Sequence, residues 1–157
     1  MPSRTGTATK TKSTFREACT VSIDIDASRE TIWSLLVDAP DFPRWNSTVT
    51  SIEGTIALGQ TLRIRVPISK RTFTVKVTAL EAPQSLVWGD GRGPMFRGTR
   101  EFALEPVGAG TTFTMTETFE GVMLPLIRRS LPDFVPVFTQ YAYDLKHEAE
   151  MQTAKRA

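Results

Sequence analysis

The side chains best placed for chemistry are one arginine and one glutamate in a predicted β-hairpin. Residues 98–119 alternate apolar and polar side chains on both sides of a connection rich in Pro and Gly. In the register that sets Leu104 opposite Phe113, Arg100 lies opposite Glu117, with about 5 Å between their Cβ atoms. Alternate residues of a strand share one face, and this face is otherwise apolar. We therefore predict an ion pair that points into the interior of the protein.

Three interpretations of the Arg100–Glu117 pair are open. In the first, Arg100 anchors a carboxylate, phenolate or keto oxygen of a ligand, because a planar guanidinium pairs bidentately with oxyanions. Glu117 then orients Arg100 or accepts a ligand hydroxyl. In the second, the pair is structural and only fixes the strand register. In the third, a shifted register places both side chains outside.

Asp90 is a further polar candidate. In a predicted strand over 85–90, Trp88 and Asp90 lie on the same face. Pairing of this strand with the next one would place Trp88 near Arg100 and Asp90 diagonal to Arg100. Two carboxylates beside one arginine could support proton transfer if burial raised one pKa. The alternative is a turn aspartate in Gly-Asp-Gly. Catalytic residues, if there are any, are expected among Arg100, Glu117 and Asp90.

The elements that must position these residues follow from hydrophobic periodicity, which predicts seven antiparallel strands. The strands are predicted over 17–25, 49–56, 61–68, 73–79 and 85–90, and on both sides of the hairpin connection, with a loop over 91–97. The apolar faces of the third and fourth strands match if Ile64 lies opposite Val77, Val66 opposite Val75 and Ile68 opposite Phe73.

Two short helices are predicted after the first strand, and one long helix ends the chain. Ser28 is the expected N-cap of the first helix, and Pro40 and Pro43 end or restart it before Trp45. From residue 131 onward, apolar positions recur on one helical stripe. That stripe consists of Phe134, Val135, Phe138, Tyr141, Ala142, Leu145 and Ala149. Only this last helix is long enough to cover the sheet, and a twisted sheet around one helix leaves a cavity.

Several of these segments resemble a known family. They are VSIDIDASRETIWSLLVDAPDFPRWN at 21–46, Ile-Glu-Gly at 52–54, Phe-Arg-Gly-Thr at 96–99 and the hairpin that follows. Over residues 17–150 the chain resembles the START-like superfamily, also called SRPBCC, and within it the polyketide cyclase/dehydrase and lipid-transport group. The resemblance implies an α+β helix-grip fold, in which a curved antiparallel sheet wraps round the long C-terminal helix and encloses a hydrophobic cavity.

Members of that superfamily bind lipids, polyketides, hormones or aromatic metabolites, and a minority catalyse cyclisation or hydration. Trp45 takes a position where the family often has an aromatic residue at the cavity entrance. Tyr141 would need a hydrogen-bond partner for its hydroxyl if it is buried. The residues predicted to bind a ligand are Arg100, Glu117, Trp88, Phe102, Met115, Val77, Ile64, Phe138, Tyr141 and Trp45.

Composition narrows the range of functions. Of 157 residues, 40% are hydrophobic and 23% are charged, and the net charge of +2 comes largely from the two ends of the chain. We therefore expect one domain over 15–153, a disordered basic tail over 1–14, no nucleic-acid partner and no membrane-spanning segment. Cys19 is the only cysteine, which favours a reducing compartment and a cytoplasmic location. His147, the only histidine, should face solvent, so no triad, metal site or cofactor is expected.

Three functions remain as hypotheses. The first is a binding protein, a monomer or weak homodimer, that carries a small, mostly hydrophobic molecule such as a lipid, polyketide or aromatic metabolite. The second is an enzyme of the polyketide cyclase/aromatase or dehydratase type that uses the same cavity. The third is a partner-binding module without a ligand. The scarcity of acid and base residues on the inward face favours the first.

Overall fold

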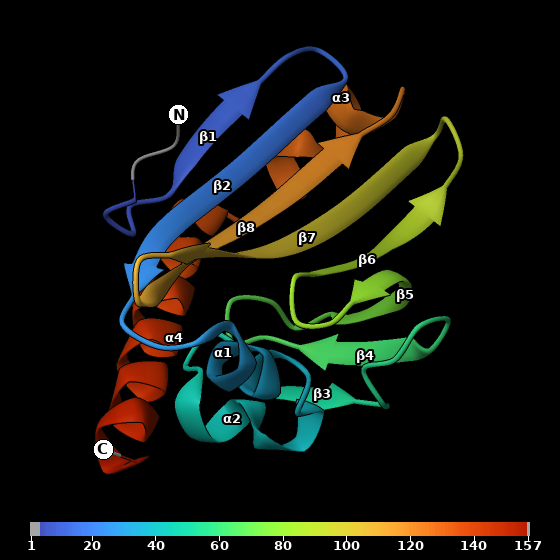
Figure 1. Ribbon diagram of the computed structural model, residues 1–157. Coiled ribbons are helices and arrows are strands. Elements are labelled where there is room, and N and C mark those ends of the chain that lie inside the picture. The colour runs from blue at the N-terminus through green and yellow to red at the C-terminus, as the bar shows by residue number, and fades with distance from the viewer. Residues whose placement is uncertain (1–3, 157) are drawn as a thin grey trace.

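The computed structural model describes residues 4–156, which form one eight-stranded antiparallel sheet curled around the C-terminal helix (Figure 1). The strand order across the sheet is β1-β2-β8-β7-β6-β5-β4-β3. The strands are β1 Thr9–Lys12, β2 Arg16–Ile25, β3 Ser51–Glu53, β4 Thr61–Arg65, β5 Thr72–Glu81, β6 Ser85–Arg92, β7 Phe96–Val107 and β8 Gly110–Glu120. The α+β helix-grip architecture predicted from the sequence is confirmed, with one strand more than expected.

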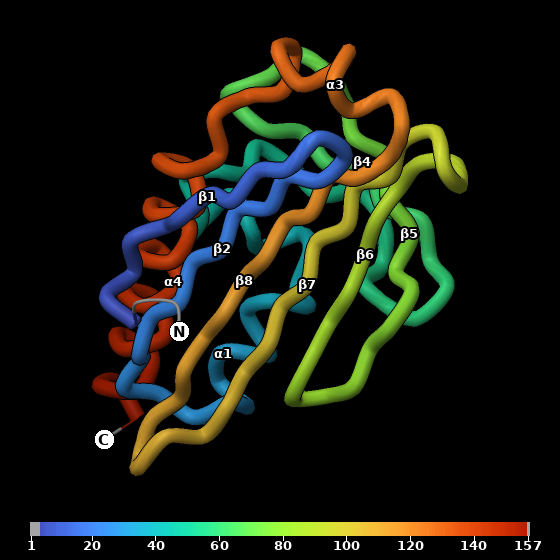
Figure 2. The backbone as a smooth tube through the Cα atoms, turned by 90° about the horizontal axis from the view of Figure 1, so that it is seen from above, coloured from blue at the N-terminus to red at the C-terminus, as the bar shows by residue number. Residues whose placement is uncertain are grey.

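Short helices flank the sheet and one long helix crosses it. They are α1 Arg29–Leu36, the 3-10 turn η1 Ala39–Asp41, α2 Phe42–Trp45, α3 Leu124–Ile127, the 3-10 turn η2 Arg128–Ser130 and α4 Phe134–Arg156. Seen from above, α4 runs along one side of the curled sheet beside β1 and β2 (Figure 2). Among the helices of residues 4–156, none combines the length and hydrophobicity needed to cross a bilayer.

The β7–β8 hairpin has the predicted register. Leu104 lies opposite Phe113 and Arg100 lies opposite Glu117. The neighbouring pair of strands also agrees with the prediction, because Trp88 on β6 lies opposite Arg100. Alternation along these strands is strong and the hairpin connection is short, so a slip by one residue would turn every buried side chain toward solvent.

Local signals in the sequence also set the helix ends. The Ser28 hydroxyl accepts a hydrogen bond from the Thr31 N–H at 3.2 Å, which caps α1 as predicted. Pro136 lies in the first turn of α4, where its missing N–H leaves no intrahelical bond unmade. The buried residues of α4 are Phe138, Tyr141, Ala142, Leu145, Glu148 and Ala149. They include most of the predicted stripe, which packs against the sheet.

The N-terminal segment differs from the prediction of a disordered tail over residues 1–14. Thr9–Lys12 form β1, which pairs with β2 at the edge of the sheet. Just before it, the Ala8 N–H donates a hydrogen bond to the Thr139 hydroxyl of α4 at 3.0 Å. A polar strand can extend a sheet in this way because main-chain hydrogen bonds hold it. Residues 1–3 of the predicted tail lie outside the described residues.

The β4–β5 register also differs from the prediction. Ile64 lies opposite Phe73 rather than opposite Val77. Pro67 accounts for the difference, because it has no N–H to donate to a ladder, and β4 therefore ends at Arg65. The shift is an even number of residues, so the apolar face stays inward.

Two further boundaries were wrong. The strand predicted over 49–56 is paired only at Ser51–Glu53. The loop predicted over 91–97 is mostly strand, since β6 continues to Arg92 and β7 begins at Phe96. The β6–β7 hairpin is therefore longer than predicted, and Asp90, Phe96 and Gly98 in it line the cavity described next.

Candidate ligand cavity

A cavity of about 170 Å³ lies between the curled sheet and the N-terminal half of α4. Side chains from β4 to β8 line one wall, and the first turns of α4 line the other. The β4–β5 turn, the segment from α3 to α4, and Thr48 and Val49 between α2 and β3 contribute the remaining residues. Most of the lining is aliphatic or aromatic, as in typical small-molecule pockets.

The Arg100–Glu117 pair lies on the wall of this cavity. The Arg100 Nε donates a hydrogen bond to a Glu117 carboxylate oxygen at 2.9 Å, and the two side chains are only 17% and 15% exposed. The guanidinium carbon also lies 5.0 Å from the centre of the Phe138 ring, a cation–π geometry. Within residues 4–156 the two Nη atoms of Arg100 have no hydrogen-bond partner. Glu117 therefore holds the guanidinium through Nε, and the Nη N–H groups remain available to donate hydrogen bonds.

Burial raises the pKa of Glu117, while the charge and the hydrogen bond of Arg100 lower it in part. The charge of Asp90 adds a smaller upward contribution. The net direction is upward because partial removal from water penalises the carboxylate more than one guanidinium compensates. The pair is therefore a polar site in an apolar wall, and the fold does not fully stabilise the charge of Glu117.

Tyr141 lines the same cavity, and its buried hydroxyl is unpartnered among residues 4–156. Its side chain is only 2% exposed. The ring stacks on Phe113 with 6.2 Å between the ring centres and an interplanar angle of 8°. Burial raises the pKa of Tyr141, and the nearby Arg100 charge lowers it in part, so the hydroxyl stays protonated near neutral pH. A protonated hydroxyl can donate a hydrogen bond to an acceptor in the cavity.

Asp90 lies at the cavity mouth. It is opposite Gly98, which makes it diagonal to Arg100 as predicted, and it also lines the cavity. A Cβ atom added at Gly98 would lie 3.1 Å from an Asp90 carboxylate oxygen and 3.4 Å from the Phe119 ring, so glycine leaves room for both. Burial raises the pKa of Asp90, and the charge of Arg71 across the mouth lowers it in part.

The structure brings together only part of the predicted ligand-binding set. The members that line the cavity are Arg100, Glu117, Trp88, Ile64, Phe138 and Tyr141. The members that do not line it are Val77, Phe102, Met115 and Trp45, and all four are buried in the core. Strand alternation predicts which face of a strand is inward, but it does not predict the depth at which the helix closes on the sheet.

Several lining residues were missed. Ile68 and Arg71 belong to the β4–β5 turn, and Ile127 and Leu131 belong to the segment between β8 and α4. Phe73 and Val75 had the correct phase in the sequence, so they could have been included. The segment from β8 to α4 has no clear periodicity, and no sequence signal identified it as a wall of the cavity.

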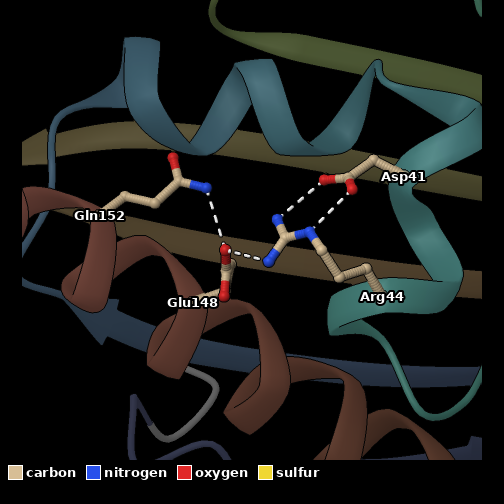
Figure 3. A network of polar contacts seen from close by, with 4 residues as sticks. All are labelled: Asp41, Arg44, Glu148 and Gln152. Carbon is tan, nitrogen blue, oxygen red and sulfur yellow. Dashed lines mark hydrogen bonds and ion pairs between the residues drawn. The ribbon is translucent and has the colours of Figure 1, made fainter.

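A second polar cluster joins α2 to α4 (Figure 3). Arg44 donates two hydrogen bonds of 2.8 Å to the Asp41 carboxylate, and its Nη1 lies 2.7 Å from a Glu148 oxygen. Gln152 donates to that same oxygen at 3.0 Å. Burial alone would raise the pKa of Glu148, but the hydrogen bonds from Gln152 and Arg44 outweigh it and the pKa is lowered. We call these four residues the α2–α4 junction.

No three potential metal ligands among His, Cys, Asp and Glu gather anywhere in residues 4–156. Cys19 is buried on β2, and burial raises the pKa of its thiol to about 11. A thiol with a raised pKa is a poor nucleophile near neutral pH. His147 is exposed on α4, as expected.

The comparison with known families agrees with this architecture. Residues 16–147 match the family described as polyketide cyclase / dehydrase and lipid transport. The chain belongs to this family. No curated protein matches the sequence.

Solved structures with the same fold are distant in sequence. A norcoclaurine synthase point mutant from Thalictrum flavum, in complex with a transition-state analogue, aligns with a TM-score of 0.69 at 12% identity, over 91% of this chain and 99% of that chain. A START superfamily protein from Mycobacterium smegmatis aligns with a TM-score of 0.62 at 19% identity, over 86% and 98% of the two chains. The Aha1 dimer from Colwellia psychrerythraea aligns with a TM-score of 0.65 at 21% identity, over 85% of this chain and 96% of that chain. At these identities the likeness extends to the fold alone.

Proposed function

We propose that this family member binds a small, mostly hydrophobic molecule in the cavity between the sheet and α4. The observation that carries the proposal is an apolar cavity whose polar groups are incompletely satisfied. Arg100 has free Nη donors, and the buried Tyr141 hydroxyl has no partner within residues 4–156. A buried polar group without a partner costs about 1–3 kcal/mol, so both groups favour an occupant that carries oxygen.

The size of the cavity limits the ligand. An engineered apolar cavity of about 150 Å³ in another protein takes up benzene. A volume of about 170 Å³ therefore suits a one- or two-ring aromatic body or a short acyl chain. A longer molecule would extend through the mouth near Asp90 and the β4–β5 turn. The ligand class that fits is an aromatic or short-chain molecule with an oxyanion or carbonyl for Arg100.

Binding of 2-naphthoate tests this proposal, and Trp88 is a built-in reporter because its ring lines the cavity. We expect 2-naphthoate to change the tryptophan fluorescence saturably. Val75→Phe, a substitution in the cavity wall, should abolish the response. Thr74→Phe is the matched control, because the neighbouring Thr74 is exposed on the outer face of the same strand. A flat titration of the folded wild-type protein, or equal effects of the two substitutions, would contradict the proposal.

A second candidate, an enzyme of the polyketide cyclase or dehydratase type, is favoured by the raised pKa of Glu117 beside Arg100. In this reading Glu117 accepts a proton from carbon next to a ketone, and Arg100 stabilises the enolate oxygen that forms. A poly-β-ketone analogue distinguishes the two functions. Consumption of the analogue that Glu117→Gln abolishes would support the enzyme, whereas saturable binding without conversion supports the carrier.

A further inference from the structure

One end of the sheet carries exposed apolar side chains that no packing explains. Phe15, Met95, Val122 and Leu126 are 53%, 51%, 55% and 77% exposed. They belong to three turns: β1–β2, β6–β7 and the segment after β8. These turns lie together at the upper edge in Figure 1 and also lie close together when seen from above in Figure 2. We call these four residues the apolar tip.

Backbone hydrogen bonds hold the turns of the apolar tip at fixed positions. The Gly121 N–H donates to the Phe15 carbonyl at 3.0 Å, and the Met123 N–H donates to the Met95 carbonyl at 2.9 Å. The Val122 N–H donates to the Pro94 carbonyl at 2.9 Å. The side chains therefore project from an ordered platform, and their ordering cost is already met by the fold.

Basic residues flank the turns that carry the apolar tip. They are Lys12, Arg16, Arg92, Arg97, Arg128 and Arg129. The acidic residues nearby are Glu120, which lies between Arg16 and Arg97 in the sheet, and Glu17, which is buried and paired with Arg128 at 3.2 Å. Residues 12–17, 92–97 and 120–129 together carry six basic and two acidic side chains, a formal charge of +4, against +2 for the whole chain.

We propose that the apolar tip and its basic surround dock on an anionic lipid bilayer. Single apolar side chains on separate turns can each enter the headgroup layer while the arginines remain among the lipid phosphates. A protein partner would require a continuous apolar core, which these scattered side chains do not provide. A nucleic acid would use the arginines and leave the aliphatic side chains of Val122 and Leu126 without a role.

The position of the tip fits a protein that exchanges an apolar ligand with a membrane. Phe96 and Ile127, which follow Met95 and Leu126 in sequence, both line the cavity. Docking would therefore bring the cavity mouth close to the bilayer surface. This last step rests on the proposed function, whereas docking itself does not.

Vesicle flotation tests the inference. We expect the wild-type chain to float with vesicles of phosphatidylcholine and phosphatidylserine, but not with vesicles of phosphatidylcholine alone, and to be released by high salt. Leu126→Ser should weaken binding about tenfold, because it removes an inserted apolar side chain. Arg97→Gln and Arg129→Gln should each weaken it about fivefold. Val107→Ser is the matched control, because Val107 is 39% exposed at the opposite end of β7.

A polarity-sensitive dye on Leu126→Cys gives a second readout, and labelling is selective because Cys19 is only 4% exposed. The dye should shift to shorter wavelength on anionic vesicles, and the same dye on Val107→Cys should not. The inference would be overturned by equal dye shifts at both positions, or by vesicle binding that Leu126→Ser does not weaken. Preferential binding to an oligonucleotide would also overturn it. Binding of 2-naphthoate by Leu126→Ser should be unchanged, so failure here is distinguishable from failure of the proposed function.

Discussion

Two arginine–carboxylate clusters border the same helix, and they differ in how completely the fold satisfies them. At the α2–α4 junction, Arg44 bridges Asp41 and Glu148, and Gln152 adds a further hydrogen bond. In the cavity, Arg100 bonds Glu117 through Nε alone. The pKa of Glu148 is lowered by its partners, whereas the pKa of Glu117 is raised by burial.

The opposite pKa shifts of Glu148 and Glu117 distinguish a cluster that stabilises the fold from a site that is suited to bind a ligand. A carboxyl whose pKa is lowered on folding contributes stability at neutral pH, and one whose pKa is raised detracts from it. The junction therefore helps to hold α2 on α4. A buried pair such as Arg100–Glu117 is often no more stabilising than apolar residues of the same shape, and such pairs are common where charged groups are kept for binding or catalysis.

The largest expected effect comes from removing Arg100. Arg100→Met leaves the Glu117 carboxylate unpaired in an apolar wall and should lower the free energy of unfolding by about 2–4 kcal/mol. Adding Glu117→Leu should recover most of that loss. Urea denaturation at neutral pH measures both variants. An unchanged single variant, or a double variant no better than the single, would remove the distinction drawn between the two clusters.

Removing Arg44 should have a smaller effect. Its side chain is 52% exposed. Arg44→Met should therefore lower the free energy of unfolding by only about 1 kcal/mol, and high salt should reduce the difference from wild type. Binding of 2-naphthoate should be unaffected. A loss as large as that of Arg100→Met would show that the junction is the more strongly coupled of the two.

The pH dependence of stability should change in opposite directions. The contribution of Glu148, whose pKa is lowered, is present above the ordinary glutamate pKa and is lost as pH falls. The contribution of Glu117, whose pKa is raised, is present below the ordinary value and is lost as pH rises through the folded pKa. The free energy of unfolding of Glu148→Gln, measured relative to wild type, should therefore fall as pH rises. The free energy of unfolding of Glu117→Gln, measured relative to wild type, should rise as pH rises. Denaturation curves from acid to neutral pH measure both, and trends of the same sign would contradict the pKa directions.

Tyr141→Phe should have the smallest effect on stability. The substitution removes a hydroxyl that has no partner, so the free energy of unfolding should stay within about 1 kcal/mol of wild type or rise. Tyr143→Phe, an exposed variant on the same helix, removes a hydroxyl that donates a 3.3 Å hydrogen bond to the Thr5 carbonyl, so it should cost about 1 kcal/mol or less. If Tyr141→Phe destabilised the free protein clearly more than Tyr143→Phe, the hydroxyl would have a partner in the absence of ligand.

The contrast between the two clusters also shows what the sequence could predict. The hairpin that pairs Arg100 with Glu117 was predictable because alternation and a short connection fix its register. The stripe of α4 was predictable for the same kind of reason. The α2–α4 junction was not, since Arg44 and Glu148 are far apart in sequence and only the docking of two helices brings them together.

The boundaries of the cavity also could not be predicted from patterns in the sequence. Val77, Phe102 and Met115 have the same inward phase as the lining residues, but they are fully buried in the core and do not line the cavity. The end of β4 depends on Pro67, which alternation alone overlooks. Ile127 of α3 contributes to the wall, and the short apolar run around it carries no period that indicates this.

The most direct test of the central claim is the preference of the cavity for an oxyanion. Isothermal titration calorimetry can compare 2-naphthoate with 2-naphthamide, which has the same rings but no charge. The wild-type protein should bind the carboxylate at least about tenfold more tightly, because Arg100 has free donors for it, and Arg100→Met should bind both molecules equally. Equal binding by the wild type, or a preference that survives in Arg100→Met, would contradict the assignment of Arg100 as the ligand anchor.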